Sequence, residues 1–149
     1  MKKLFGILVL VMFLVSATGM APDRDDNKQA LVGTWELVSF YMYDGTDVID
    51  TVPTTEGYRQ IKMYNEKGNI MWTRYVPKDS VEWFGYGTYS ATENTLTEKL
   101  EYGSASMMKI IDTLRVFQFE LQVQENAFSQ ITLDEEGNRI SSENYKRLN

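Results

Sequence analysis

The 149-residue sequence contains no cysteine and no histidine. Their absence excludes thiol catalysis, Ser-His-Asp triads, disulfide bonds and zinc sites built on these side chains. A site made of carboxylates alone for a hard cation stays open, but no spacing of acidic residues indicates one. We therefore expect neither a metal site nor a cofactor. A chain of this length can bury a sizeable core without disulfide bonds.

Positive charge is also scarce. The formal net charge is -6, and no run of basic residues occurs beyond the first three positions. Proteins that bind nucleic acids neutralise phosphates with Lys and Arg, so we expect no nucleic-acid partner. No feature of the sequence sets the oligomeric state.

The first 21 residues have the pattern of a secretory signal peptide. Lys2 and Lys3 precede an apolar run over residues 4–15, and the small residues 16–19 follow it. The run is too short to span a bilayer, which favours a cleavable signal over a membrane anchor. A buried N-terminal helix is the alternative. No Cys follows the run, so we expect no lipid anchor and no membrane span after cleavage, and we predict a secreted or periplasmic protein.

Residues 22–30 are polar and charged, and we interpret them as a flexible leader in which Asp25 or Asp26 can cap one helical turn. Residues 31–149 form the predicted folded domain. They are rich in aromatic and β-branched residues that alternate with turn signals, which is typical of β-strands. Eight strands are predicted, over residues 33–43, 57–64, 69–76, 83–90, 95–102, 115–123, 126–133 and 140–148. Residues 104–112 are expected to form a short helix or a lid strand.

Short and long connections alternate along the chain. The short ones are residues 65–68, 91–94 and 124–125, and the long ones are residues 44–56, 77–82, 103–114 and 134–139. In an up-and-down meander this alternation puts all tight turns at one end and all long loops at the other. The fold predicted is therefore an all-β, eight-stranded antiparallel up-and-down barrel with little helix and one open mouth, about wide enough for one small ligand. A two-sheet sandwich is the alternative.

Period-two alternation assigns the side chains to faces if charged residues are placed outside. Glu36, Lys62 and Lys99 then face out, and the FGYGTY glycines mark a bend or bulge. The residues predicted to face inward are Trp35, Leu37, Ser39, Tyr41, Arg59, Ile61, Met63, Leu96, Glu98, Leu100, Phe117, Phe119, Leu121, Glu143, Tyr145 and Arg147, with the pairs Trp72 and Arg74, Phe84 and Tyr86, and Phe128 and Gln130 less firmly placed.

Charges that face inward are costly unless they are paired or hydrated. Three interpretations stay open for these groups. They form internal ion pairs, such as Glu98 with Arg59 or Arg74. They line a water-filled cavity. Or an inward Arg binds the acidic head of a ligand.

The motif Gly33-Thr34-Trp35 resembles the Gly-x-Trp motif of the lipocalins and the wider calycin group. Arg147, in the closing segment ENYKRL, is similar to the Arg that packs across that Trp at the closed end. With YRQIKMYNEKGNI and FGYGTYS, these segments resemble bacterial secreted lipocalin-like domains of uncharacterised function, over residues 31–148. The resemblance implies the eight-stranded barrel and a small hydrophobic ligand, whereas the Cys pair and the second motif of many lipocalins are missing. A guanidinium stacked on the indole would tie the first strand to the last, so Trp35 and Arg147 are expected to serve stability.

The sequence leaves three functions open. The preferred hypothesis is an exported binding protein for a small, partly hydrophobic molecule, with loop 44–56 as a lid. Its predicted ligand contacts are Tyr41, Arg59, Ile61, Trp72, Glu98, Phe117 and Phe119. The alternative is a structural module with a filled barrel that binds a protein or glycan through exposed aromatics such as Tyr43, Tyr75, Trp83 and Tyr102. An enzyme, with Glu98 as acid or base, is not expected, because no triad, metal spacing or phosphate loop is present.

Overall fold

The computed structural model describes residues 26–149, and the predicted signal peptide lies outside them. None of the helices in this part of the chain is long and apolar enough to cross a membrane. The elements are α2 (Asp26–Leu31), β1 (Gly33–Asp44), β2 (Asp47–Pro53), β3 (Arg59–Tyr64), β4 (Asn69–Tyr75), β5 (Trp83–Ala91), β6 (Thr95–Gly103), α3 (Ala105–Ile111), β7 (Val116–Val123), β8 (Ala127–Leu133) and β9 (Arg139–Arg147).

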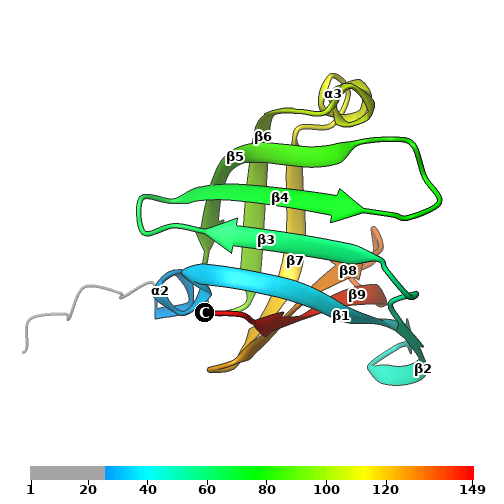
Figure 1. Cartoon of the computed structure of the whole chain (residues 1–149). Helices are drawn as coiled ribbons and strands as arrows, with labels where there is room; N and C mark the ends of the chain where they lie inside the picture. The colour runs from blue at the N-terminus through cyan, green and yellow to red at the C-terminus, as the bar shows by residue number, and fades with distance from the viewer. Residues whose placement is uncertain (1–25) are drawn as a thin grey trace, which may run out of the picture.

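The strands make one antiparallel sheet that closes on itself (Figure 1). Each strand from β3 to β9 pairs with the next, and β1 pairs with both β3 and β9. These eight strands, called the ring below, match the eight predicted ones. The predicted antiparallel up-and-down fold with little helix is confirmed, and a single closed sheet contradicts the two-sheet alternative.

β2 was not predicted. It forms a hairpin with the outer half of β1, so the prediction that residues 44–56 are a loop is wrong for this strand. Every residue of β2 is exposed, and its sequence DVIDTVP includes two acidic residues and a proline. Without a buried face, the strand has no alternation of apolar and polar residues that would reveal it.

One end of the ring is sealed by α2 and an aromatic core. Leu31 at the end of α2 is fully buried, so residues 26–30 of the predicted leader form an ordered turn of helix. The Trp35 ring meets the Phe128 ring edge-on, with centroids 4.9 Å apart, and Phe128 stacks on Tyr145 at 4.6 Å. The tight turns of β3–β4, β5–β6 and β7–β8 lie at this end, as the loop alternation predicts.

The Gly-x-Trp segment and Arg147 meet at the sealed end. The guanidinium carbon of Arg147 lies 4.1 Å from the centroid of the Trp35 ring. Its Nη1 and Nη2 donate to the carbonyls of Val32 and Ala30 at 2.8 and 2.7 Å. Gly33 has φ +138°, and a Cβ there would lie 2.6 Å from Arg147 Nη1. Glycine is therefore required both by its backbone conformation and by the guanidinium beside it.

α3 connects β6 and β7 at the opposite end. Ser104 caps the helix, because its hydroxyl accepts a hydrogen bond from the backbone N–H of Met107. The segment predicted as a short helix or a lid strand is thus a helix. Met107 and Ile111 are buried and turn inward over the ring.

Candidate functional site

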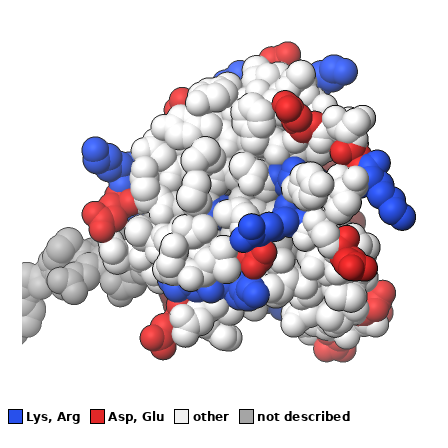
Figure 2. Space-filling view, viewed as in Figure 1, with Lys and Arg blue, Asp and Glu red and all other residues white. Residues whose placement is uncertain are grey.

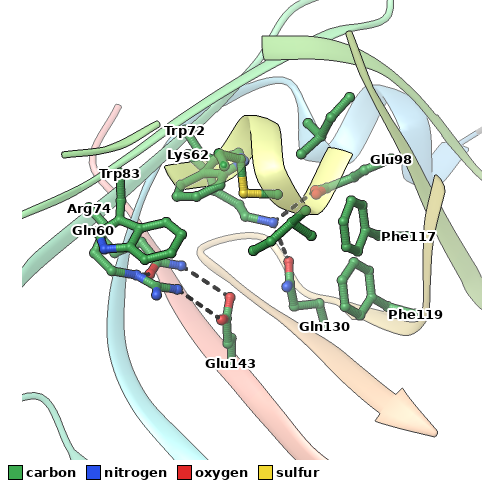
Figure 3. Close-up of a pocket in the computed structure, with 13 residues that line it drawn as sticks. Gln60, Lys62, Trp72, Arg74, Trp83, Glu98, Phe117, Phe119, Gln130 and Glu143 are labelled. Atoms are coloured by element: carbon green, nitrogen blue, oxygen red, sulfur yellow. Dashed lines mark hydrogen bonds and ion pairs between the residues drawn. The ribbon is translucent and has the colours of Figure 1, made fainter. Parts of the chain in front are cut away.

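A cavity of about 280 Å³ opens inside the ring beneath α3 (Figure 3). Its walls come from β3 to β9 and from α3. The lining residues are Gln60, Lys62, Trp72, Arg74, Trp83, Glu98, Leu100, Met107, Ile110, Phe117, Phe119, Gln130 and Glu143.

The middle of the cavity is apolar. Phe117 and Phe119 line it from β7, Leu100 from the neighbouring β6, and Trp72 from β4. The Trp72 indole has room because Gly85 lies opposite it on β5: a Cβ at Gly85 would be 2.6 Å from Trp72 Nε1. The glycine of the FGYGTY segment therefore shapes this wall.

The deep end of the cavity holds a buried ion pair, which with its partners we call the floor cluster: Lys62, Tyr64, Glu98 and Gln130. Lys62 Nζ lies 2.8 Å from Glu98 Oε1 and also donates to the amide oxygen of Gln130. The Tyr64 hydroxyl donates to the same Glu98 oxygen at 2.6 Å. The side chains of Lys62 and Glu98 are only 4% and 5% exposed. Burial of the two charges is tolerable because each faces the other and both are hydrogen-bonded.

Nearer the opening lies a second network, the mouth cluster: Tyr58, Gln60, Arg74, Glu143 and Tyr145. Gln60 is its centre. The amide oxygen of Gln60 accepts from Tyr58 and from Arg74 Nε, and its Nε2 donates to Glu143 and Tyr145. Arg74 Nη2 is 4.0 Å from Glu143 Oε1, and the two side chains are 31% and 24% exposed.

Two indoles flank the arginine of the mouth cluster. The guanidinium carbon of Arg74 lies 5.8 Å from the Trp72 ring centroid and 6.0 Å from that of Trp83. Both distances are within the range of cation–π attraction. The contacts hold the guanidinium at the opening, where its Nη2 also faces Glu143 Oε1.

Two phenols beside the cavity stay neutral over a wide pH range. Burial, and then the charge of the neighbouring Glu98, raise the pKa of Tyr64 well above its usual value. Burial and the charge of Glu143 do the same to the pKa of Tyr145. Both hydroxyls therefore act as hydrogen-bond donors to carboxylates and not as bases.

The structure brings together four of the seven predicted ligand contacts: Trp72, Glu98, Phe117 and Phe119 all line the cavity. Tyr41, Arg59 and Ile61 do not. Arg59 is exposed on the outside of the ring and pairs with Glu36. The predicted inward face of Met63 is also wrong, since Met63 is exposed.

The error on β3 has one cause. Lys62 was placed outside because it is charged, which turned the whole strand over. In the structure Gln60, Lys62 and Tyr64 are the buried residues of β3. Of the three interpretations left open for the inward charges, an internal ion pair is found for Glu98, but its partner is Lys62 and not Arg59 or Arg74.

The error at Tyr41 comes from a bulge in β1. Its pairing with β9 shifts between Leu37 and Ser39, which exchanges the two faces beyond that point. Phe40 is then opposite the cavity residue Glu143, and Tyr41 is on the other face, opposite Ser142. Ser39 likewise leaves the inner face and bonds Asn144.

Other inward faces are as predicted. Leu96, Leu100, Leu121, Phe128, Gln130 and Tyr145 are buried, and Arg74 and Glu143 line the cavity. On β5 the prediction is wrong: Gly85 and Gly87 are buried, while Phe84 is exposed. A bulge between Tyr86 and Gly87 confirms the interpretation of the FGYGTY glycines.

Three features of the cavity were not predicted from the sequence: Gln60, Lys62 and the inward position of Trp83. Trp83, predicted to be an exposed aromatic, lines the cavity beside Arg74. A usable signal was the spacing of Gln60, Lys62 and Tyr64, because polar residues that alternate with Ile61 and Met63 also fit a polar cavity. In residues 26–149 no group of three or more acidic side chains is placed to hold a metal ion.

The sequence matches no protein-family model, and a search of curated proteins gave no match. Two solved structures are similar in fold. A lipocalin-like protein from Bacteroides uniformis superposes with a TM-score of 0.53 at 16% identity, over 80% of this chain and 99% of that one. An uncharacterised protein from Bacteroides eggerthii superposes with a TM-score of 0.51 at 13% identity, over 78% and 98%. Together with the closed ring and the Trp35–Arg147 contact, these similarities show that the chain has a lipocalin-like fold.

Proposed function

We propose that this chain is an exported, non-enzymatic binding protein that holds one small, partly apolar molecule in the ring. The cavity beneath α3 is the observation that carries the proposal. An aromatic wall with a few convergent polar groups is the usual make-up of a ligand site. Its volume of about 280 Å³ is near the lower end of the roughly 300–1,000 Å³ typical of such sites, which suits a molecule of one or two rings.

The polar groups of the cavity support binding over catalysis. Glu98 and Glu143 each accept a hydrogen bond from a neutral tyrosine and face a cation. Both carboxylates therefore serve as hydrogen-bond acceptors within fixed polar networks. No Cys or His is present in the sequence to supply a nucleophile or a conventional base.

Blocking the opening tests the proposal. Ile110 of α3 lines the cavity, whereas the adjacent Lys109 is exposed on the same helix and does not. Ile110→Trp should close the mouth, and Lys109→Trp is the matched control. Native mass spectrometry of protein purified from its own source, and calorimetric titration with aromatic and fatty acids, should show a ligand for the control and not for Ile110→Trp. Equal binding by both variants, or none by the unmodified protein, would refute the proposal.

Export rests on residues 1–21 and has a separate test. We expect the intact mass of the mature protein, isolated from the periplasm or medium, to correspond to cleavage after Ala17 or Gly19. A full-length mass in the cell interior would contradict it.

One observation favours a second function, an interaction module. Met63, Met71, Tyr86 and Tyr102 pair side by side across β3 to β6 on the outside of the ring, an arrangement we call the outer row. Met63, Met71 and Tyr102 are exposed, and Figure 2 shows much of this face without charge. If the outer row binds a protein, native mass spectrometry from source should find a complex that Met71→Glu dissociates and Thr132→Glu, on β8, leaves intact.

A further inference from the structure

The floor cluster has hydrogen-bonding capacity that the protein does not use. Gln130 is 5% exposed, and its Nε2 donates to no other group in residues 26–149. Glu98 uses Oε1 for both of its partners, and its Oε2 has none in that part of the chain. The described residues hold no fully enclosed polar side-chain atom without a partner, so both atoms are reached from the cavity.

These free groups at the floor have a definite chemical complement. Gln130 Nε2 offers donors, Lys62 Nζ has a third N–H beyond its two bonds, and Glu98 Oε2 offers an acceptor. A hydroxyl group both donates one hydrogen bond and accepts others. The Lys62–Glu98 pair is neutral in sum, so the floor favours a neutral hydroxyl over a charged group.

The mouth cluster suits a different chemical group from the floor cluster. Within residues 26–149 the Arg74 guanidinium donates a hydrogen bond only through Nε, and its Nη2 makes a long ion pair of 4.0 Å with Glu143 Oε1. The terminal nitrogens therefore keep N–H groups for a closer acceptor. This planar fork matches a carboxylate. Glu143 fills this position only at long range, because its Oε1 lies 4.0 Å from Arg74 Nη2, beyond hydrogen-bond distance, and its Oε2 accepts from Gln60 and Tyr145. A cationic ligand is disfavoured, since both indoles at the opening already face Arg74.

The separation between floor and mouth sets the length of the ligand. Lys62 pairs with Trp72 and Gln60 with Arg74, so the two levels are two residues apart on β3 and β4. Two residues of strand correspond to about 7 Å. Phe117, Phe119 and Trp72 line the space between and suit a flat ring.

We propose that the ligand is a hydroxyaromatic carboxylic acid, with its hydroxyl between Gln130 and Glu98, its ring against Phe117 and Phe119, and its carboxylate on Arg74. The inference rests on the proposed function and adds the chemical class to it. A wholly apolar ligand would cover the free groups of Gln130 and Glu98 without replacing their contact with water, which opposes binding.

Three probes test the two ends separately in the unmodified protein by isothermal titration. They are 4-hydroxyphenylacetate, phenylacetate, which lacks the hydroxyl, and 2-(4-hydroxyphenyl)ethanol, which lacks the acid. We expect the first to bind about tenfold or more tightly than either of the others, the effect of one unpaired buried polar group. Equal affinities for 4-hydroxyphenylacetate and phenylacetate would overturn the assignment of the floor. Equal affinities for the acid and the alcohol would overturn that of Arg74.

Variants of Gln130 and Arg74 test whether these residues cause the preferences for the hydroxyl and for the carboxylate. Gln130→Leu should remove the preference for the hydroxyl and keep that for the acid, and Arg74→Gln should do the reverse. Gln122→Leu and Arg59→Gln, at exposed positions on β7 and β3, are the controls and should keep both. Far-ultraviolet circular dichroism confirms folding, and the probe series on unmodified protein does not depend on the variants.

The outcomes separate this inference from the proposed function. If other apolar molecules bind in the cavity and these probes do not, the ligand class is wrong and the binding function stands. If neither the probes nor a panel of aromatic and fatty acids bind, both proposals fail.

Discussion

The Lys62–Glu98 ion pair offers the sharpest test of how the cavity is built. Lys62→Met replaces the lysine by an apolar chain of similar length. It leaves Glu98 at the floor with the Tyr64 hydroxyl and without its cation. We expect a large loss of stability, because a buried charge then remains without its counter-charge.

The size of the loss follows from burial. Both side chains are about 95% buried, and removal of one partner from such a pair costs about 3–5 kcal/mol. At roughly 4 °C per kcal/mol for a domain of this size, the lower figure corresponds to a fall in Tm of about 12 °C. Chemical denaturation with urea, followed by tryptophan fluorescence, gives the free energy of unfolding directly.

Two further variants show whether the charge itself is the cause. Lys62→Met with Glu98→Gln removes both charges and keeps an acceptor for Tyr64, so it should be more stable than Lys62→Met alone. Arg59→Met breaks the Arg59–Glu36 pair on the same strand, where the arginine side chain is 60% exposed. Arg59→Met should lower the free energy of unfolding by less than about 1 kcal/mol. If Lys62→Met is no more destabilising than Arg59→Met, the reasoning about the floor is wrong.

Three predictions concern the sealed end and the buried phenols. Gly33→Ala should lower the free energy of unfolding by at least about 2 kcal/mol, because the φ at this position is unfavourable for alanine and the added Cβ would collide with Arg147. Trp35→Ala should cost about 3–5 kcal/mol, since it removes a fully buried indole beneath that guanidinium. Because folding raises the pKa of Tyr64 and Tyr145, the unfolded chain loses these protons first as pH rises above 10, the usual value. The stability present below pH 10 should then fall by about 1.4 kcal/mol per pH unit for each phenol, until the pH passes the folded pKa.

Thermal melts check all three predictions. An unchanged melt for Trp35→Ala would show that the sealed end does not depend on the indole. Gly45→Ala is the comparison for Gly33→Ala, because Gly45 also has positive φ but has no atom near the position of a Cβ. Above pH 10, Tyr64→Phe should flatten the dependence of Tm on pH, while Tyr75→Phe, which removes an exposed phenol, should not. Equal slopes in these two variants would contradict the assignment.

The fold was predictable because its signals are local. Aromatic runs, turn residues and the alternation of loop lengths each depend on a few consecutive positions, and they gave eight strands and their order. β6 and β7 were oriented correctly, since Leu96, Leu100 and Leu121 alternate with charged or amide side chains that do face out.

The site was predictable only in part because its chemistry is long-range. Lys62 is buried because Glu98 lies across the cavity, and the two strands are separated in the sheet by β4 and β5. No local pattern on β3 indicates that partner. The assumption that charged residues face outward therefore gave β3 the wrong orientation in the prediction. The bulge after Leu37 likewise has no signal in the sequence. Because of it, Tyr41 does not lie on the inner face where it was predicted.

β2 has a consequence for self-association. A closed ring has no free strand edge, but β2 pairs on one side only and restores one, beside the exposed side chains of Val48, Ile49 and Val52. An unpaired apolar edge invites the addition of strands from other molecules. Asp47, Asp50 and Pro53 interrupt it with charge and with a residue that cannot donate. Loss of the two aspartates would therefore leave the cavity intact and expose the protein to aggregation through this edge.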